Sequence, residues 1–282
     1  MRRGRAARRA CAVLGAAGAI VAPVPAPAEP RPLWEVGIGA TALRLPDYRG
    51  SDESRGYLLP IPYVVYRGES VRIDRSGARG YLFDTPRFTL DLSLGASVPV
   101  DSSRNRARIG MPSLRPLVEF GPVLEWHLLR SPTGRLDVRL PVRAAFALSR
   151  DGARDVGMVG GPAIAWDSTL QAAGGRWNVG LLGAALYGDR RYHQHFYAVD
   201  ADYATASRAA YAPGGGFAGT QLTASASRRL ADVWLGAFVR LDSVAGAAFE
   251  SSPLVRARRQ WVAGVAVAWV LSASGTLVQD AD

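Results

Sequence analysis

Alternation of apolar and polar residues with a period of two, over segments of about ten residues, is the feature that most restricts the fold of this chain. Three segments show this alternation most plainly, and they begin at Phe88, at Leu136 and at Val233. After Ala28 there is no apolar run of about 18 residues, so no transmembrane helix is predicted. Weak alternation repeated many times is typical of membrane β-strands. The clearest segment places Phe88, Leu90, Leu92, Leu94, Ala96 and Val98 on one face and Thr89, Asp91, Ser93, Gly95 and Ser97 on the other.

The same alternation would also fit a soluble β-sandwich with one solvated face. Two tryptophans favour a membrane barrel instead, because Trp261 and Trp269 fall on one face of the segment WVAGVAVAW. Eight residues of tilted strand cover roughly 20 Å, close to the apolar band of about 25 Å between two aromatic girdles. Trp34, Trp261 and Trp269 are therefore predicted to be girdle residues.

Twelve strands are predicted, and the 31 glycines and 18 prolines suit short strands and turns better than long helices. Tight connections such as RSPTG and RLAD alternate with longer ones such as PDYRGSDESRG and the stretch 189–217. This asymmetry predicts short periplasmic turns and longer outer loops. The fold class is therefore all-β, an antiparallel transmembrane β-barrel, with ten strands as the alternative because the fourth segment is doubtful. The predicted strands lie near 34–45, 58–67, 70–75, 79–84, 87–99, 114–129, 134–149, 155–170, 176–188, 218–230, 232–245 and 258–271.

A polar segment, PDYRGSDESRG, stands directly before the apolar run LLPIPYVVY. The first part is predicted to be an outer loop, because Gly and Asp supply turn geometry. The second part is predicted to be a strand that returns through the membrane. Pro60 and Pro62 remove ladder donors, so this strand is expected to begin distorted at the outer rim.

The first 28 residues have the organisation of a secretory signal peptide. A basic segment from Arg2 to Arg9 precedes an apolar segment from Ala10 to Val24, and Ala26 and Ala28 give a small-x-small cleavage site. The apolar segment is shorter than the roughly 20 residues of a spanning helix. Residues 1–28 are therefore predicted to be cleaved, which leaves 29–282 as a single barrel domain exported to the cell outer membrane.

Removal of this segment also changes the charge and the cysteine content. Five of 34 basic residues leave, so the net charge becomes 29 − 24 = +5 rather than +10. The remaining basic residues stand beside acids and form no stripe, which excludes a nucleic-acid partner. The only cysteine, Cys11, is lost as well, so no disulfide or cysteine metal site is expected.

Three groups of residues are of types that can support chemistry. The pair His193 and His195 lacks a carboxylate-rich partner segment, so a polar loop is favoured over a zinc site. The glycines of 213–216 stand outside any βαβ pattern, so no phosphate cradle is predicted. His127, Asp137 and Ser149 are available for hydrolase chemistry, yet no G-x-S-x-G motif is present. The prediction is a protein that is not an enzyme, with no cofactor and no metal.

Charged residues on the polar faces form the most informative group. Confined charges must be paired. One interpretation is a salt-bridge network that fills a narrow barrel, and the other is a charged constriction that selects small solutes. The network is favoured, because the side chains of a 12-strand barrel can obstruct its lumen. The predicted lumen residues are Arg115, Glu119, Glu125, Arg139, Arg143, Arg240 and Asp242.

In several blocks the sequence resembles the MltA-interacting protein (MipA/OmpV) family of outer-membrane proteins. The order and spread of the blocks carry the resemblance through most of the mature chain. The blocks are Pro46, Tyr48, 50–52 and 60–66; 90–92, Asp101, Ser102, Asn105, 110–111 and 119–122; 140–143; and Tyr192, 196–197, 211–216, 240–241 and 252–255.

This resemblance implies an outer-membrane barrel of a Gram-negative bacterium. Its named member is described as a scaffold that links a lytic murein transglycosylase to a peptidoglycan synthase, and the family has no established catalytic residues. The implied partners are a murein hydrolase and synthase, with outer-membrane lipid and lipopolysaccharide around the barrel. The alternative is a narrow porin or an adhesin-like surface barrel. One departure is the tail after Trp269, since such barrels often end in an aromatic residue.

Overall fold

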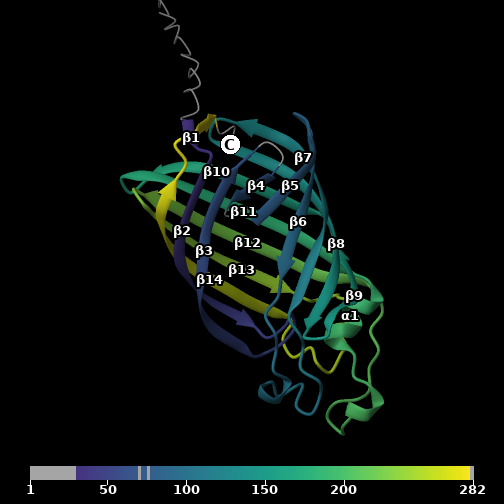
Figure 1. Cartoon of the computed structure of the whole chain (residues 1–282). Helices are drawn as coiled ribbons and strands as arrows, with labels where there is room; N and C mark the ends of the chain where they lie inside the picture. The colour runs from purple at the N-terminus through teal and green to yellow at the C-terminus, as the bar shows by residue number, and fades with distance from the viewer. Residues whose placement is uncertain (1–29, 69–70, 75–76, 280–282) are drawn as a thin grey trace, which may run out of the picture.

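The computed structural model describes residues 30–68, 71–74 and 77–279, which form mainly antiparallel strands (Figure 1). The predicted cleavage residues Ala26 and Ala28 lie outside the described residues. No helix in the described ranges is long and apolar enough to cross a membrane. The elements are β1 (Pro30–Pro32), β2 (Trp34–Pro46), β3 (Ser54–Arg67), β4 (Val71–Asp74), β5 (Gly77–Asp84), β6 (Phe88–Ala96), η1 (Ser102–Arg104), β7 (Leu117–Ser131), β8 (Gly134–Ser149), β9 (Gly152–Gly160), β10 (Ala163–Ala172), β11 (Gly175–Gly188), α1 (Arg190–Tyr197), η2 (Ala201–Tyr203), β12 (Gly216–Leu230), β13 (Val233–Ser243), β14 (Arg259–Ala273) and β15 (Leu277–Gln279).

Strands β2 to β14 form a closed ring of antiparallel neighbours, in which β14 pairs back with β2. β9 and β10 occupy one position in the ring, because both pair with β8 and both pair with β11. They are separated by Gly161, with φ of 140°, and Pro162, which has no N–H for a ladder. The single strand predicted near 155–170 is thus divided in two. The predicted 12-strand antiparallel barrel is confirmed, and the ten-strand alternative is wrong.

The connections differ in length between the two ends of the barrel, as predicted (Figure 1). The turn end carries short connections, including two-residue turns in which Ala173 and Ala231 have φ of 47° and 48°, as tight hairpins require. The loop end carries a short connection as well, between β8 and β9, whereas the short strand β4 pairs with β3 only at Tyr66 and Arg67, near the turn end. Its four long connections are β2–β3 (47–53), β6–β7 (97–116), β11–β12 (189–215) and β13–β14 (244–258).

The two faces of the strands show which side of the wall is apolar. Along β7, Glu125 and His127 are buried inside the ring, whereas Leu124, Trp126 and Leu128 are 43%, 48% and 46% exposed on the outside. A soluble sandwich would bury its apolar faces instead. An outward apolar face and an inward polar face are the arrangement of a membrane barrel.

Strand β3 differs from its prediction at both prolines. It begins at Ser54 rather than near residue 58, and it pairs with β2 from Ser54 to Tyr66 without a register shift. Pro60 and Pro62 therefore stand inside a regular strand, and the expected distortion at the outer rim is absent from this pairing.

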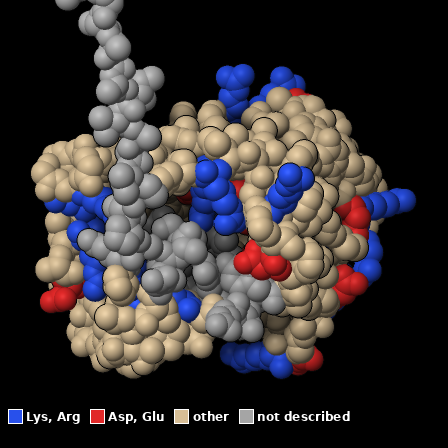
Figure 2. Space-filling model, turned by 90° about the horizontal axis from the view of Figure 1, so that it is seen from above, with Lys and Arg blue, Asp and Glu red and all other residues tan. Residues whose placement is uncertain are grey.

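The described ends of the chain meet at the turn end, where β1 and β15 form a separate two-stranded sheet. The N–H of Leu33 donates to the carbonyl of Thr276, and the N–H of Ser274 donates to the carbonyl of Trp34. Figure 2 looks onto this end and shows arginine and acidic side chains in the middle of the face and around its edge. The turn end is thus a charged surface with a short extra sheet beside the barrel wall.

Candidate functional site

A buried ion network occupies the interior toward the turn end. β7 and β8 place Glu125 directly opposite Arg139, and Arg139 Nε lies 3.0 Å from Glu125 Oε1. Arg139 Nη2 also lies 3.7 Å from Asp137 and 4.0 Å from Asp167 on β10. The side chains of Glu125 and Asp137 are only 8% and 2% exposed. One guanidinium therefore compensates carboxylates from three strand positions.

His127 joins the same network through both ring nitrogens. Its Nδ1 lies 2.8 Å from Asp137 Oδ1, and its Nε2 lies 2.8 Å from Thr89 Oγ1. The Thr89 hydroxyl also lies 2.7 Å from Asp84 Oδ1, so its single hydrogen has two acceptors within reach. A serine nucleophile would have to donate to the imidazole. Ser149, the predicted serine candidate, donates to the Gly152 carbonyl at 3.0 Å instead.

The same cluster contains three groups of the type that bind metals. One ligand atom each from Glu125, His127 and Asp137 lies within 4.8 Å of the others. The Arg139 guanidinium contacts both carboxylates and already supplies the positive charge that a cation would bring. These residues therefore act chemically as a buried ion-pair network.

A second pair lies closer to the loop end. Gly121 packs against the backbone of Val142 and Arg143, where a Cβ would overlap the Val142 carbonyl oxygen, and Arg143 Nε donates to Ser93 Oγ at 2.8 Å. Arg143 Nη1 lies 3.9 Å from Glu119, which also accepts a 2.9 Å hydrogen bond from the Tyr192 hydroxyl. Tyr192 belongs to α1, so a loop helix is hydrogen-bonded to the inner wall.

The remaining predicted lumen residues, Arg240, Asp242 and Arg115, do not join either of these two clusters. Arg240 Nη2 lies 3.1 Å from the buried Asp242, and Arg49 of the β2–β3 loop is 3.9 Å from the same carboxylate. Arg115 is wrongly predicted as a lumen residue. It stands in the β6–β7 connection, is exposed, and lines a loop-end cavity, because β7 begins only at Leu117.

One buried triple at the turn end was not predicted. Glu35 is 2% exposed and is paired with Arg67 at 3.0 Å and with Arg229. These residues come from β2, β3 and β12. Arg229 on β12 is 194 positions from Glu35 in the sequence. Alternation indicates that each residue faces inward, but nothing in the sequence indicates that the three meet.

The four long connections pack together into a cap over the loop end. Its buried core includes Tyr48, Val100, Leu114, Tyr197, Val199, Ala218, Val244, Ala247, Phe249 and Leu254. The rings of Tyr197 and Phe249 are stacked with centroids 3.6 Å apart. The hydroxyl of Tyr48 donates to the Leu254 carbonyl at 2.8 Å, and that of Tyr197 donates to the Arg49 carbonyl at 2.9 Å. Burial raises the pKa values of both phenols.

Polar contacts join the first two long loops within this cap. Asn105 Nδ2 donates to Asp47 at 2.8 Å and to Ser51 at 3.1 Å. Arg55 at the start of β3 forms an ion pair with Asp47 at 2.7 Å. Arg108 donates to the Phe196 carbonyl on α1 at 2.9 Å. The β6–β7 loop is therefore hydrogen-bonded both to the β2–β3 loop and to α1.

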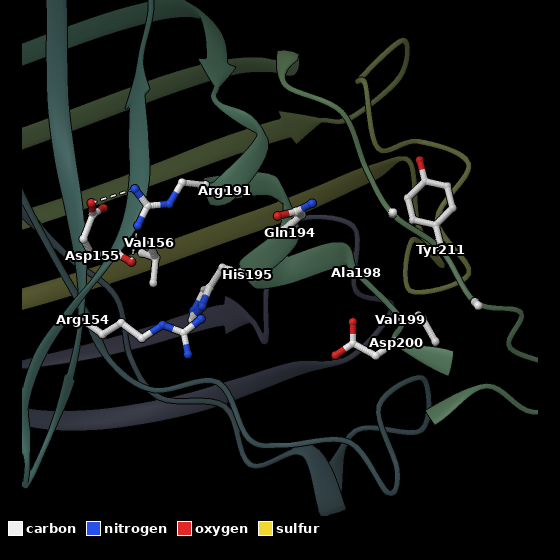
Figure 3. Close-up of a pocket in the computed structure, with 12 residues that line it drawn as sticks. Arg154, Asp155, Val156, Arg191, Gln194, His195, Ala198, Val199, Asp200 and Tyr211 are labelled. Atoms are coloured by element: carbon white, nitrogen blue, oxygen red, sulfur yellow. Dashed lines mark hydrogen bonds and ion pairs between the residues drawn. The ribbon is translucent and has the colours of Figure 1, made fainter. Parts of the chain in front are cut away.

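A cavity of about 700 Å³ opens between α1, β9 and the β11–β12 connection (Figure 3). Arg154, Asp155, Arg191, His195, Asp200 and Tyr211 are among the lining residues. Arg191 donates to Asp155 at 2.9 Å. Burial, together with nearby Arg108 and Arg154, lowers the pKa of His195 to about 4, so this imidazole is neutral at neutral pH.

The three predicted girdle residues lie on the outside of the barrel. Trp261 is 63% exposed, Trp269 is 49% exposed and Trp34 is 36% exposed. Trp34 begins β2 at the turn end, and Trp269 pairs with Val233 beside a tight turn of the same end. Trp261 stands near the start of β14 at the loop end. The three tryptophans therefore lie on the outer face near both ends of the wall.

A closed 12-strand ring with an apolar outside, a charged inside and unequal ends defines this protein as a β-barrel of the outer-membrane type. The family model described as "MltA-interacting protein MipA" matches residues 38–271. The chain therefore belongs to the MipA family, as the resemblance predicted.

Solved structures give more distant similarities. A bacterial polysaccharide outer membrane secretin is 10% identical, with a TM-score of 0.40 over 86% of this chain and 99% of that chain. The CymD monoaromatic hydrocarbon channel is 9% identical, with a TM-score of 0.32 over 86% and 89%. The outer membrane protease OmpT from Escherichia coli is 7% identical, with a TM-score of 0.29 over 84% and 96%. No curated protein matches the sequence. At TM-scores below 0.5, these likenesses support no statement about activity.

Proposed function

We propose that this protein is a non-enzymatic barrel of the outer membrane that holds peptidoglycan-remodelling enzymes, a lytic transglycosylase and a synthase, at the membrane. The observation that carries the proposal is the packed cap, which joins all four long loops above an interior crossed by ion pairs. Such an interior suits a closed scaffold better than an open pore. The family name, MltA-interacting protein, supports a murein hydrolase as one partner.

The turn end is the proposed contact surface, because short turns of such barrels face the periplasm. Tight turns alone offer little of the roughly 1,600 Å² that a standard interface buries. The β1–β15 sheet adds area at this end, and Leu277 on β15 is 59% exposed. A short sheet with an open edge can pair with an extended segment of a partner.

Crosslinking in mild detergent with a purified lytic transglycosylase tests this proposal. We expect a crosslinked complex with the wild type and a weaker one with Leu277→Asp, which adds charge to the proposed surface. Ser251→Asp, at the exposed loop end, is the matched control and should crosslink as the wild type does. If no complex forms, or if the two variants lose it equally, the scaffold proposal fails.

The alternative is a narrow porin or a surface-binding barrel, and the arginine-lined cavity of Figure 3 favours the surface-binding form. Conductance in planar bilayers distinguishes a pore from the closed scaffold. We expect the wild type to be silent. A steady conductance that changes in Arg143→Ala would favour the pore and count against the closed scaffold.

A further inference from the structure

The hydrogen-bonded wall is incomplete between β3 and β6. Within the described residues, β3 pairs with β4 only at Tyr66 and Arg67, because β4 is four residues long. On the other side, β5 pairs with β6 only as far as Leu92. Among the residues that the structure describes, none therefore pairs in a ladder with 54–65 of β3 or 93–96 of β6 on the sides that face each other. Figure 1 shows far-wall ribbons between β3 and β6 below the short hairpin. We call this unpaired stretch of the wall the seam.

Pro60 and Pro62 are placed where this missing partner would be. The N–H of Arg67 donates to Leu33 and the carbonyl of Glu53 accepts from Asp47, so odd-numbered residues of β3 bond toward β2. Even-numbered residues then point their backbone groups toward the seam, since the direction alternates along a strand. The two prolines thus lack an N–H at an unpaired edge, which is the position where strands tolerate proline.

The inner face of β3 is apolar between Arg55 and Arg67. Glu35 is buried inside the barrel and pairs with Val65, so the odd-numbered residues of β3 face inward. The Tyr63 ring lies 6.3 Å from that of Trp234, and Leu59, although it faces inward, is 38% exposed. The inner face of β3, β2, β14 and β13 carries Tyr57, Leu59, Ile61, Tyr63, Val65, Leu43, Val262, Ala266, Phe238 and Trp234.

The wall on the β6 side is charged instead. Ser93 is the first β6 residue beyond the β5 pairing, and it accepts the hydrogen bond from Arg143. The carboxylate of Glu119 is 3.9 Å from Arg143, and the Arg143 side chain is 30% exposed. A cation with one neutral contact and one long ion pair therefore stands just inside the seam, opposite an apolar wall.

We propose that the seam admits a single-chain anionic amphiphile from the membrane, with its tail on the apolar wall and its head group at Arg143. Unpaired backbone at membrane depth is tolerated where it lines a wet cavity, which suits an opening onto the lumen. A strand from another protein is a poor occupant, because the prolines cannot donate to its ladder. This inference does not depend on the scaffold role.

Fluorescence quenching with brominated ligands tests the proposal on the full barrel in lipid nanodiscs. Trp234 is the lumen-facing tryptophan, so the difference in quenching between the wild type and Trp234→Phe isolates its signal. The probes are 9,10-dibromostearate and the dibrominated alcohol of the same chain length. We expect saturable quenching of Trp234 by the acid, with roughly tenfold weaker binding in Arg143→Ala, the loss expected for a charged hydrogen bond.

Two further variants complete the design. Thr41→Phe fills the apolar wall opposite Leu59 without changing a charge and should also weaken binding. Arg191→Ala removes an arginine of α1 that pairs with Asp155 at the loop end, away from the apolar wall, and should leave binding unchanged. Heat-modifiable migration on a gel shows that each variant is folded. The proposal is overturned if Trp234 shows no saturable quenching, if the alcohol binds as tightly as the acid, or if folded Arg143→Ala and Thr41→Phe both bind as the wild type does.

Discussion

Replacement of Arg139 by alanine is the most direct test of the interior network. The change removes the guanidinium that lies 3.0 Å from Glu125 and 3.7 Å from Asp137, and it leaves both carboxylates buried. Loss of one partner of a buried pair costs about 3–5 kcal/mol, because the two carboxylates then lose the cation they share, although Arg135 Nε stays 3.8 Å from Asp137. With a urea m-value of about 3 kcal/mol per M, the unfolding midpoint should fall by roughly 1 to 2 M.

The measurement is urea unfolding of the barrel refolded into phospholipid vesicles, followed by tryptophan fluorescence and by heat-modifiable migration. Arg106→Ala is the matched control, because Arg106 also bridges two carboxylates, Asp52 and Glu53, but its side chain is 75% exposed. An exposed pair contributes about 0–1 kcal/mol, so this variant should unfold near the wild-type midpoint. Equal midpoints for the two variants would refute the view that the interior charges are confined and mutually compensated.

Three other changes examine the cap and the wall. Phe249→Ala should cost about 3–5 kcal/mol of cap stability, since it removes the ring stacked on Tyr197, and loop cleavage by a protease should accelerate while the strands stay intact. The pKa of His195 is lowered to about 4, so the unfolded loop binds a proton that the folded loop excludes between about pH 6.5 and 4. Cap stability should therefore fall as the pH decreases through this window, and His195→Gln should remove that part of the dependence in a proteolysis series. Gly121→Val should prevent folding, because a Cβ there overlaps the Val142 carbonyl, and no heat-modifiable species should form.

The barrel could be predicted from the sequence because its physical causes are local. Alternation along 88–96 determines which side chains face lipid, and two-residue turns such as 173–174 need no distant partner. Alternation continues across Gly161 and Pro162 and so predicts one strand near 155–170, although these two residues mark the division of β9 from β10. Pro60 and Pro62 predict a distortion, since the sequence does not show that the strand beside them is short.

The cap and the ion pairs could not be predicted in the same way. The Tyr48 hydroxyl reaches the Leu254 carbonyl across 206 positions, and no periodicity records such a contact. Arg115 shows the converse error, because a charge near the start of a predicted strand was counted as a lumen residue although the strand begins two residues later. Which charged residues meet at the same height inside the barrel depends on the pairing registers of all twelve strand positions together, and the sequence does not show these registers.

The residues that carry the family resemblance lie both in the cap and in the strands. Many of them are in the cap, including Tyr48, Asn105 and Tyr197, each of which makes a specific contact with another loop. A lipid-facing position needs only an apolar side chain, so many sequences satisfy it. A position such as Asn105, which donates to both Asp47 and Ser51, needs one side chain of one shape. The cap positions of these blocks thus depend on particular side chains, whereas blocks such as 60–66 and 119–122 lie in the strands of the wall.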